Sequence, residues 1–152
     1  MSKKEIAMEY FSQGYNCAQS VLLAFKDECG LDADTITKIT LPFGGGVARL
    51  RSICGSVSGM VMAYGLICCE PGLTVGEKKK EQYMNTQELV NEFSKRNGSF
   101  VCGELLSGVK VTEGPAPEVR TPEYYKKRPC KELVGDAAEI LEEYLAKNHK
   151  NE

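Results

Sequence analysis

Residues 53–69, ICGSVSGMVMAYGLICC, form the part of the sequence that most restricts the fold. The segment reads as a buried helix, and Gly55, Gly59 and Ala63 recur in it at every fourth position. Residues with this spacing share one face of a helix. Glycine inside a helix costs about 1 kcal/mol relative to alanine, so such a stripe needs a packing reason. We therefore expect a second helix to lie close against this face, with a cofactor as the less favoured alternative.

Helix start and stop signals in the rest of the chain predict an all-α protein. Asn16 and Gln19 form a capping box that opens a helix ended by Gly30. No segment alternates with the period of a strand, apart from a weak VKV. We predict one helical-bundle domain over residues 1–152, with short accessory helices and a glycine-rich loop. Further helices are expected at residues 4–11, after Asp32, at 53–69, at 75–96 with Tyr83, Val90 and Phe93 facing inward, at 100–106, after Thr121 and at 129–147.

Seven cysteines are a high number for a chain of 152 residues. The N-terminus lacks the apolar region of a secretory signal, so a cytoplasmic location is expected, where stable structural disulfides are rare. The odd number also excludes complete internal pairing. In such a compartment, cysteine enrichment indicates metal ligation or redox chemistry, although any single cysteine is more often a small core residue.

The predicted helices divide these cysteines into two groups. Four fall in the first turn of a helix: Cys17, Cys54, Cys102 and Cys130. There, free N–H groups and the positive end of the helix dipole stabilise a thiolate. Arg49 and Arg51 precede Cys54, and Arg128 precedes Cys130, and these cations act in the same direction. The other three close helices, where the dipole opposes a thiolate, and are expected to be ordinary thiols: Cys29, Cys68 and Cys69.

The spacing of the four helix-start cysteines restricts the kind of site. Intervals of 37, 48 and 28 residues contain no C-x-x-C pair, so any site must be assembled by the tertiary fold. A redox disulfide, a four-thiolate zinc site and an iron–sulfur cluster all stay open. The single histidine, His149, lies in the last four residues. Cys–His catalysis and zinc sites with histidine ligands are therefore not expected.

A glycine loop, PFGGGVARLRS at residues 42–52, precedes the buried helix. It lacks the Gly-Lys-Ser/Thr of a Walker loop and does not open from a strand. We favour a shaped turn that positions Cys54 and lines a pocket. Ser52 is a candidate N-cap for the helix that contains Cys54, and Cys102 follows Ser99 by three residues.

Composition argues against several functional classes. The net charge is −2 with no strong basic block, so neither nucleic acid nor an anionic membrane surface is an expected partner. No segment has the apolar length of a membrane span. The protein is therefore not expected to be membrane-embedded. The redox partner stays unknown, and the oligomeric state, a homodimer included, stays open.

Four segments together resemble a known family: GYNCAQSVLLAF, FGGGVARLRSICGSVSG, FVCGELLSG and PCKELVGDAAEIL. They are similar to the C-GCAxxG-C-C family of redox-active proteins, whose signature is four cysteines, one of them inside a C-G-A-x-x-G motif. Ser56 stands where the family pattern has alanine. The resemblance implies a small bacterial or archaeal protein, often encoded beside transporters. Carried over by position, the signature cysteines are the four helix-start residues Cys17, Cys54, Cys102 and Cys130.

Three functional hypotheses follow. In the leading one, Cys54 attacks as a thiolate, and Cys17, Cys102 or Cys130 resolves it as a disulfide. In the second, the same four cysteines bind zinc or an iron–sulfur cluster. In the third, from a different class, the protein binds a small ligand or a partner, and whether it is an enzyme stays open. The candidate residues for such a ligand pocket are the glycines Gly44, Gly45, Gly46, Gly55 and Gly59.

Overall fold

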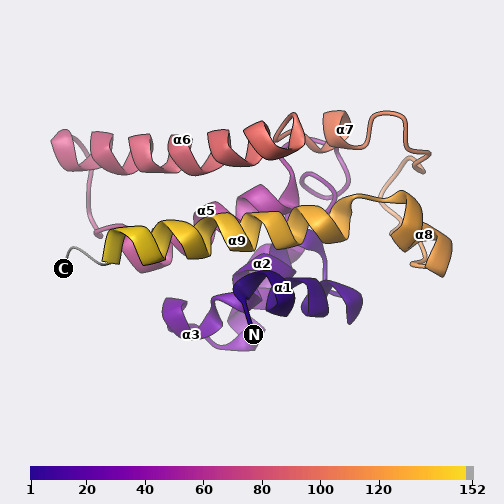
Figure 1. Ribbon diagram of the computed structural model, residues 1–152, viewed down its shortest axis with the longest axis horizontal. Coiled ribbons are helices and arrows are strands. Elements are labelled where there is room, and N and C mark those ends of the chain that lie inside the picture. Colours follow the sequence, from indigo (N-terminus) through magenta and orange to yellow (C-terminus); the bar gives the residue numbers. More distant parts are fainter. Residues whose placement is uncertain (150–152) are drawn as a thin grey trace.

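The computed structural model describes residues 1–149 and the side chains of residues 1–148. Within that range the chain is helical and has no β-strand, so the all-α prediction is confirmed (Figure 1). In chain order, the elements are α1 (Lys3–Ser12), α2 (Cys17–Ala24), α3 (Lys26–Cys29), α4 (Ala33–Thr40), the 3₁₀ turn η1 (Leu41–Phe43), α5 (Gly55–Cys68), α6 (Glu77–Asn97), α7 (Cys102–Leu105), α8 (Pro122–Lys127) and α9 (Cys130–His149).

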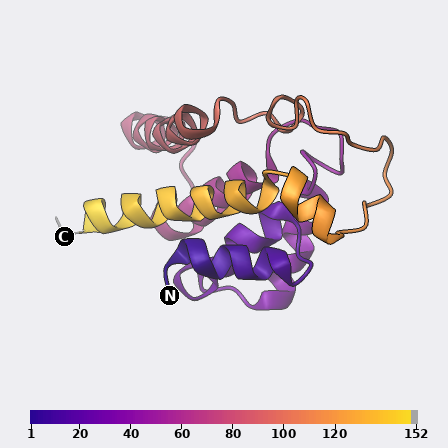
Figure 2. The same ribbon diagram turned by 45° about the vertical axis from the view of Figure 1, so that its right-hand side comes forward.

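Helix α2 lies at the centre of the core, and all of its residues after Cys17 are buried. It packs against α1, α5 and α9, while α6 lies along the outer side of α5 and α9 (Figures 1 and 2). A helix that is apolar on every side is stable only when neighbours surround it. The largest side chains of this core belong to one cluster: Phe11, Leu22, Phe25, Ile36, Met60, Tyr64, Leu89, Phe93 and Leu141.

The Asn16 capping box opens α2 where the sequence predicts. Asn16 Oδ1 accepts from the Gln19 N–H at 2.9 Å, and Gln19 Oε1 accepts from the Asn16 N–H at 2.9 Å, which completes the capping box. The helix expected to reach Gly30 is divided at Phe25, whose φ of −107° and ψ of 19° leave the helical region. Gly30 then ends α3 in the left-handed conformation, with φ of 70°.

The small-residue stripe of α5 packs against α2, as the sequence predicts. A Cβ at Gly59 would lie 2.8 Å from the Ala18 carbonyl oxygen and 3.0 Å from Val21 Cβ. A Cβ at Gly55 would lie 3.1 Å from Cys17 Cβ. The second helix therefore occupies this face at Gly59, and its close approach explains why glycine stands in the interior of α5.

Gly59→Ala is expected to destabilise the protein by about 1–3 kcal/mol, because the new methyl group overlaps the backbone of α2. Gly65→Ala, in the same helix, is the matched control because no atom lies within 4 Å of its added Cβ. That variant is expected to gain up to about 1 kcal/mol from helix propensity. Urea denaturation of both variants measures the difference, and equal stabilities would contradict the packing argument.

The buried stripe of α6 runs through Leu89 and Phe93, which are 2% and 0% exposed. The prediction that Tyr83 faces inward is wrong, since its side chain is 62% exposed and the Lys79 ammonium lies 5.5 Å from its ring centre. Tyr83 lies six positions before Leu89, which is far from a whole number of turns at about 3.6 residues per turn, so the two side chains are on different sides of α6. Only one side of α6 contacts the core.

The C-terminal helix α9 continues two residues beyond the predicted end at Lys147. The side chain of His149 lies outside the described part, so the expectation about it is not tested. Among the helices within residues 1–149, none combines the length and the apolar character needed to cross a membrane.

Candidate functional site

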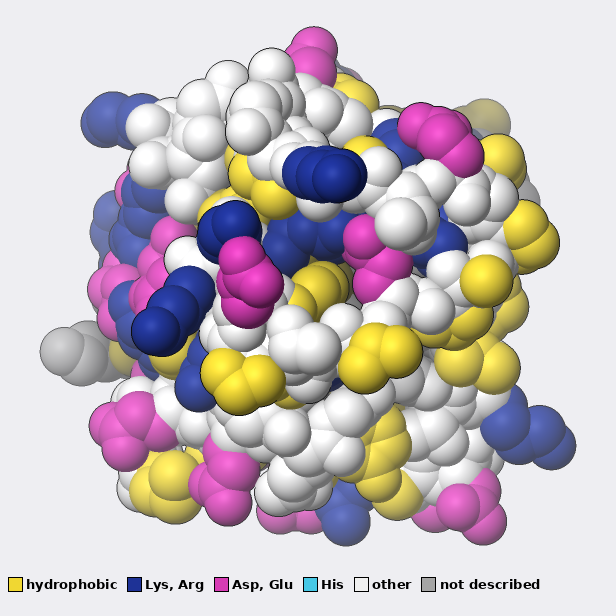
Figure 3. All heavy atoms as spheres, turned by 90° about the vertical axis from the view of Figure 1, so that its right-hand side faces the viewer, with side chains coloured by type: hydrophobic (Ala, Val, Ile, Leu, Met, Phe, Trp, Pro, Cys, Tyr) yellow, Lys and Arg dark blue, Asp and Glu magenta, His cyan; other side chains and the backbone are white. Residues whose placement is uncertain are grey.

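A single cavity of about 600 Å³ is lined by all four helix-start cysteines. It opens at the end of the molecule that carries α7 and α8, and Figure 3 views that end directly. The cysteines come from four separate elements and are brought together by the fold. The cavity lining contains Cys17, Cys54, Cys102 and Cys130, together with Arg49, Arg51, Arg120, Arg128, Glu118, Tyr124 and glycines of the 44–46 loop.

Each of these cysteines lies at the start of a helix. Cys17, Cys102 and Cys130 are the first residues of α2, α7 and α9, and Cys54 is the N-cap of α5. The predicted placement at helix starts is therefore confirmed for all four. The prediction of Ser52 as the N-cap of α5 is wrong, because Cys54 itself occupies that position. Val101 is the N-cap of α7.

The backbone segments that carry Cys54 and Cys102 lie side by side. An isolated antiparallel β-bridge between Ile53 and Val101 holds them together. The Cys54 N–H donates to the Phe100 carbonyl at 2.8 Å, and the Cys102 N–H donates to the Ser52 carbonyl at 2.6 Å. This bridge holds the start of α5 beside the start of α7, although 48 residues separate the two cysteines. No local sequence signal indicates it, since a two-residue pairing has no detectable period.

The glycine loop forms a left-handed turn beside α7. Gly45 and Gly46 have φ of 69° and 72°, and Val47, Ala48 and Arg49 follow with φ of 65°, 48° and 66°. Non-glycine residues in this region cost about 1–2 kcal/mol each. The turn is held by N–H groups of residues 47–49, 51 and 52, which donate to carbonyls of residues 42–46. Backbone strain of this kind persists only where the surrounding structure enforces it.

Four of the five glycines proposed for a ligand pocket line the cavity, namely those at 44, 45, 46 and 55. Gly46 shows why glycine is required, since a Cβ there would lie 2.6 Å from both Cys102 Cβ and the Ser52 nitrogen. Gly59 does not line the cavity and packs on α2 instead. The cavity wall next to Cys102 is therefore formed by the backbone of these glycines, without side chains.

The Cys17 and Cys130 thiols are in hydrogen-bonding contact. The Cys17 thiol donates to the Cys130 sulfur, and this bond, helped by Arg128, Arg120 and Arg51, lowers the pKa of Cys130 from 9.0 to about 7 against the opposing effect of burial. The same hydrogen bond and burial raise the pKa of Cys17 well above 9.0. Near neutral pH, Cys130 is therefore about half ionised, while Cys17 stays protonated.

Cys54 and Cys102 are less acidic than the helix-start argument predicts. Burial raises the pKa of Cys54 to about 11, although N–H groups of Ser56 and Val57 favour the thiolate. Burial also raises the pKa of Cys102, against the Arg51 guanidinium, whose Nη1 lies 3.9 Å from the Cys102 sulfur. Of the two arginines expected to activate Cys54, Arg51 therefore acts on Cys102. The electrostatics favour Cys130, rather than the expected Cys54, as the thiolate.

The loop of residues 107–120 forms one wall of the cavity through Pro115, Pro117 and Glu118. Arg49 fastens it, donating to the Thr112 carbonyl at 2.9 Å and to further carbonyls of the loop. Glu118 forms an ion pair with the buried Arg128 and lies 3.8 Å from Arg49. Sequence reasoning missed this wall, because a polar Pro/Gly-rich loop gives no sign of what it covers.

The remaining cysteines lie at the ends of α3 and α5, as predicted, and outside this cavity. Burial raises the pKa of Cys29 to about 11 and that of Cys69 above 9.0. Cys68 lines a separate cavity of about 320 Å³ with Tyr64 and Tyr144. None of the four cavity cysteines is disulfide-bonded in this structure.

The alternative that the four cavity cysteines bind zinc or an iron–sulfur cluster stays a prediction. Among the described side chains, no three His, Cys, Asp or Glu residues converge closely enough to hold one metal ion. Structural zinc and iron–sulfur sites take four thiolates at bonding distance. Ligation by these residues would therefore require their sulfurs to move.

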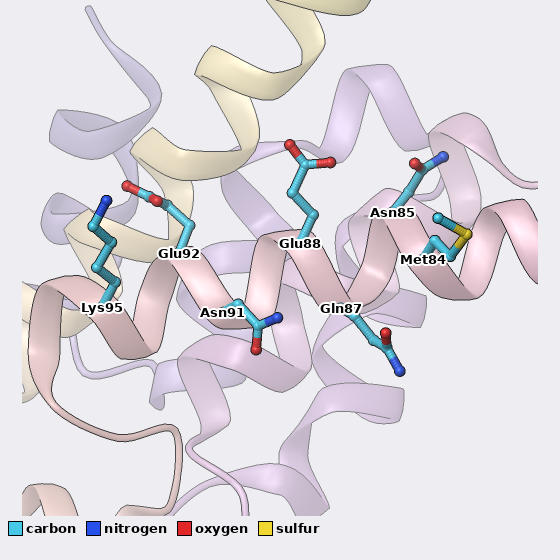
Figure 4. A pocket seen from close by; sticks show the side chains of 7 residues that line it. All are labelled: Met84, Asn85, Gln87, Glu88, Asn91, Glu92 and Lys95. Carbon is cyan, nitrogen blue, oxygen red and sulfur yellow. The ribbon is translucent and has the colours of Figure 1, made fainter.

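A second hollow of about 500 Å³ lies along α6 and is unrelated to the thiols (Figure 4). Its lining residues all belong to one helix and contain no cysteine or arginine. They are Met84, Asn85, Gln87, Glu88, Asn91, Glu92 and Lys95. Side chains from a single helix provide no convergent groups, so we assign no site there.

The profile of one protein family matches residues 15–144, a span that contains all four cavity cysteines. The description of this family is "Putative redox-active protein (C_GCAxxG_C_C)". The chain belongs to this family. This member is 24% identical over 147 residues to an "Uncharacterized protein" of Archaeoglobus fulgidus, a match that covers 90% of this chain and 89% of that protein. No solved structure matches the chain significantly.

Proposed function

We propose that this C_GCAxxG_C_C protein is a thiol–disulfide redox protein in which Cys17 and Cys130 cycle between two thiols and one disulfide. The observation that carries the proposal is the contact between these two sulfurs inside a cavity, with the pKa of Cys130 lowered to about 7. A thiolate is the attacking species in thiol–disulfide exchange, and a pKa near ambient pH is the most effective.

The reaction balances with a disulfide as the oxidant. The Cys130 thiolate attacks one sulfur of the substrate disulfide, forms a mixed disulfide and expels the other sulfur as a thiolate. Cys17 gives its proton to the expelled thiolate and attacks the Cys130 sulfur. The Cys17–Cys130 bond then forms and the second substrate thiolate leaves. Two electrons pass from the cysteine pair to the substrate, and the reverse sequence oxidises a dithiol.

In this proposal, Cys54 and Cys102 line the cavity but are not part of the disulfide that forms. Their raised pKa values keep them protonated at neutral pH, and both line the cavity beside the reacting pair. We do not propose a metal or cluster as the second function, because the described side chains do not converge on one point.

The proposal is tested by equilibrating the reduced protein with mixtures of reduced and oxidised dithiothreitol in the absence of air. We expect one disulfide to form, with a loss of two hydrogens in the intact mass and a Cys17–Cys130 linkage in peptide maps. Cys17→Ser and Cys130→Ser are expected to abolish it, while Cys29→Ser, outside the cavity, is expected to leave it unchanged. A linkage between other cysteines, or stoichiometric zinc or iron in the anaerobically purified protein, would refute the proposal.

A further inference from the structure

The charged side chains of the cavity are unlike those of the whole chain. Its charged lining consists of Arg49, Arg51, Arg120, Arg128 and Glu118. Four of the five arginines in the sequence thus line this one cavity, whereas none of the lysines that the structure describes does. The chain as a whole carries a net charge of −2. A cationic cavity in an acidic protein is therefore a local arrangement and does not follow from overall composition.

Arginine is the side chain best suited to planar anions, since its guanidinium offers paired N–H donors. Glu118 already neutralises one guanidinium, since it pairs with Arg128 and lies 3.8 Å from Arg49. Arg120 donates to the Phe11 and Tyr15 carbonyls at 2.5 and 2.8 Å, so its charge is held in place without a carboxylate. The lining therefore keeps an excess of positive charge.

The Arg51 guanidinium has a hydrogen-bond donor that lacks an acceptor in the described part of the chain. Its Nη1 contacts the Cys102 sulfur, but its Nη2 is buried and has no hydrogen-bond partner among the described residues. A buried guanidinium N–H without an acceptor is costly, and buried polar groups are nearly always paired. An acidic group of a ligand in this cavity would supply that acceptor.

The position and size of the cavity connect this donor to the thiol pair. Arg51, Cys17 and Cys130 line the same space, whose volume of about 600 Å³ suits a small molecule. In Figure 3, Lys and Arg side chains gather around a hollow with hydrophobic groups in its floor. A ligand that places an anion at Arg51 therefore has its remaining atoms within the cavity that holds the reacting sulfurs.

We propose that the substrate of the Cys17–Cys130 pair is a small disulfide that carries acidic groups, one of them bound by Arg51. This inference rests on the proposed thiol–disulfide function and names its substrate class. The electron balance is the one given above, with the acidic disulfide taking two electrons and leaving as two acidic thiols.

Three disulfides with the same two-carbon arms separate charge from chemistry. They are 3,3′-dithiodipropionate with two carboxylates, bis(2-hydroxyethyl) disulfide without charge, and cystamine with two ammonium groups. The rate at which each oxidises the reduced protein is divided by its rate with 2-mercaptoethanol, a reference thiol without a charged group, which removes differences in intrinsic reactivity. We expect the normalised rate to be about tenfold higher for the dicarboxylate than for the neutral disulfide, the size expected for one charge-assisted hydrogen bond, and lowest for cystamine.

Arg51→Gln is expected to remove most of this preference. Because Arg51 also helps to lower the pKa of Cys130, the variant slows all three reactions alike, and the ratio of the rates is the readout. Lys80→Gln removes the same charge from the far end of α6 and is expected to keep the wild-type ratio (Figure 1). Equal normalised rates in the wild type, or an unchanged ratio in Arg51→Gln, would overturn the inference.

Binding of suberate, which replaces the two sulfurs of 3,3′-dithiodipropionate by methylene groups, tests recognition without redox chemistry. We expect calorimetry to detect suberate binding to the reduced protein and a loss of about tenfold in affinity with Arg51→Gln. If the Cys17–Cys130 disulfide forms but neither suberate binding nor a charge preference is seen, the substrate inference fails and the proposed function stands. If no disulfide forms with any probe, the proposed function itself fails.

Discussion

At pH 7, Cys130 is expected to be alkylated by iodoacetamide on the order of 100 times faster than Cys54. A thiol with a pKa of about 7 is half ionised at this pH, whereas one with a pKa of about 11 is ionised in only about one molecule in ten thousand. The less basic thiolate is also the weaker nucleophile, which reduces the difference to roughly two orders of magnitude. Mass spectrometry of the separate peptides gives the rate at each cysteine.

The pH dependence of the alkylation rate tests whether the hydrogen bond from Cys17 causes the reactivity of Cys130. The rate at Cys130 is expected to rise with pH and reach half of its maximum near pH 7. Cys17→Ala removes the thiol that donates to the Cys130 sulfur, so the midpoint is expected to move to higher pH. Cys54→Ser, in the same cavity, is the control and leaves the midpoint in place. Faster labelling of Cys54 than of Cys130 would restore Cys54 as the attacking thiolate.

Glu118→Ala is expected to destabilise the protein by about 3 kcal/mol, at the lower end of the range for breaking a buried ion pair. The Arg128 side chain is only 6% exposed, so it keeps its charge in the core without a partner. Glu118 also accepts from the Thr112 N–H at 3.1 Å, and this bond fixes the loop that walls the cavity. Urea denaturation at pH 7 measures the loss.

The matched control is Glu123→Ala, which removes the exposed pair with Lys127. It is expected to leave the midpoint almost unchanged, since exposed ion pairs contribute little. The pairing with Arg128 lowers the pKa of Glu118 below 4.5, so the stabilisation is fully present above pH 4.5 and is lost as the pH falls through the lowered value. Equal effects of the two substitutions would show that the Glu118–Arg128 pair is not structurally important.

Most of the helices could be predicted from the sequence because their signals are local. The Asn16 capping box and the Gly30 stop depend on residues within one or two turns. The spacing of Gly55, Gly59 and Ala63 is equally local, and it indicates which face of α5 another helix can approach closely. The division of the cysteines into four at helix starts and three elsewhere follows from the same boundaries. Tyr83 shows the limit of such prediction, since it is exposed although it was expected to face inward. The side of an amphipathic helix that contacts the core depends on the helices packed beside it.

The cavity could not be predicted in this way. Its walls include a left-handed turn at residues 45–49, whose conformation non-glycine residues rarely adopt, and a loop fastened by Arg49 across more than 60 residues of sequence. The gathering of four arginines also became visible only in three dimensions. The loop fastening and the gathering of arginines arise from contacts between distant segments, which leave no periodic pattern in the sequence.

The sequence by itself determined where the four cysteines lie on their helices, since N-caps, glycine stops and prolines act within a few residues. Only the tertiary structure decided which of them is acidic. A helix start favours a thiolate at all four positions, but burial opposes it, most clearly at Cys54. Cys130 alone receives a hydrogen bond from another of these thiols, that of Cys17, and lies near three arginines. A thiol's pKa is set by the groups packed around its sulfur, and those groups come from distant parts of the chain.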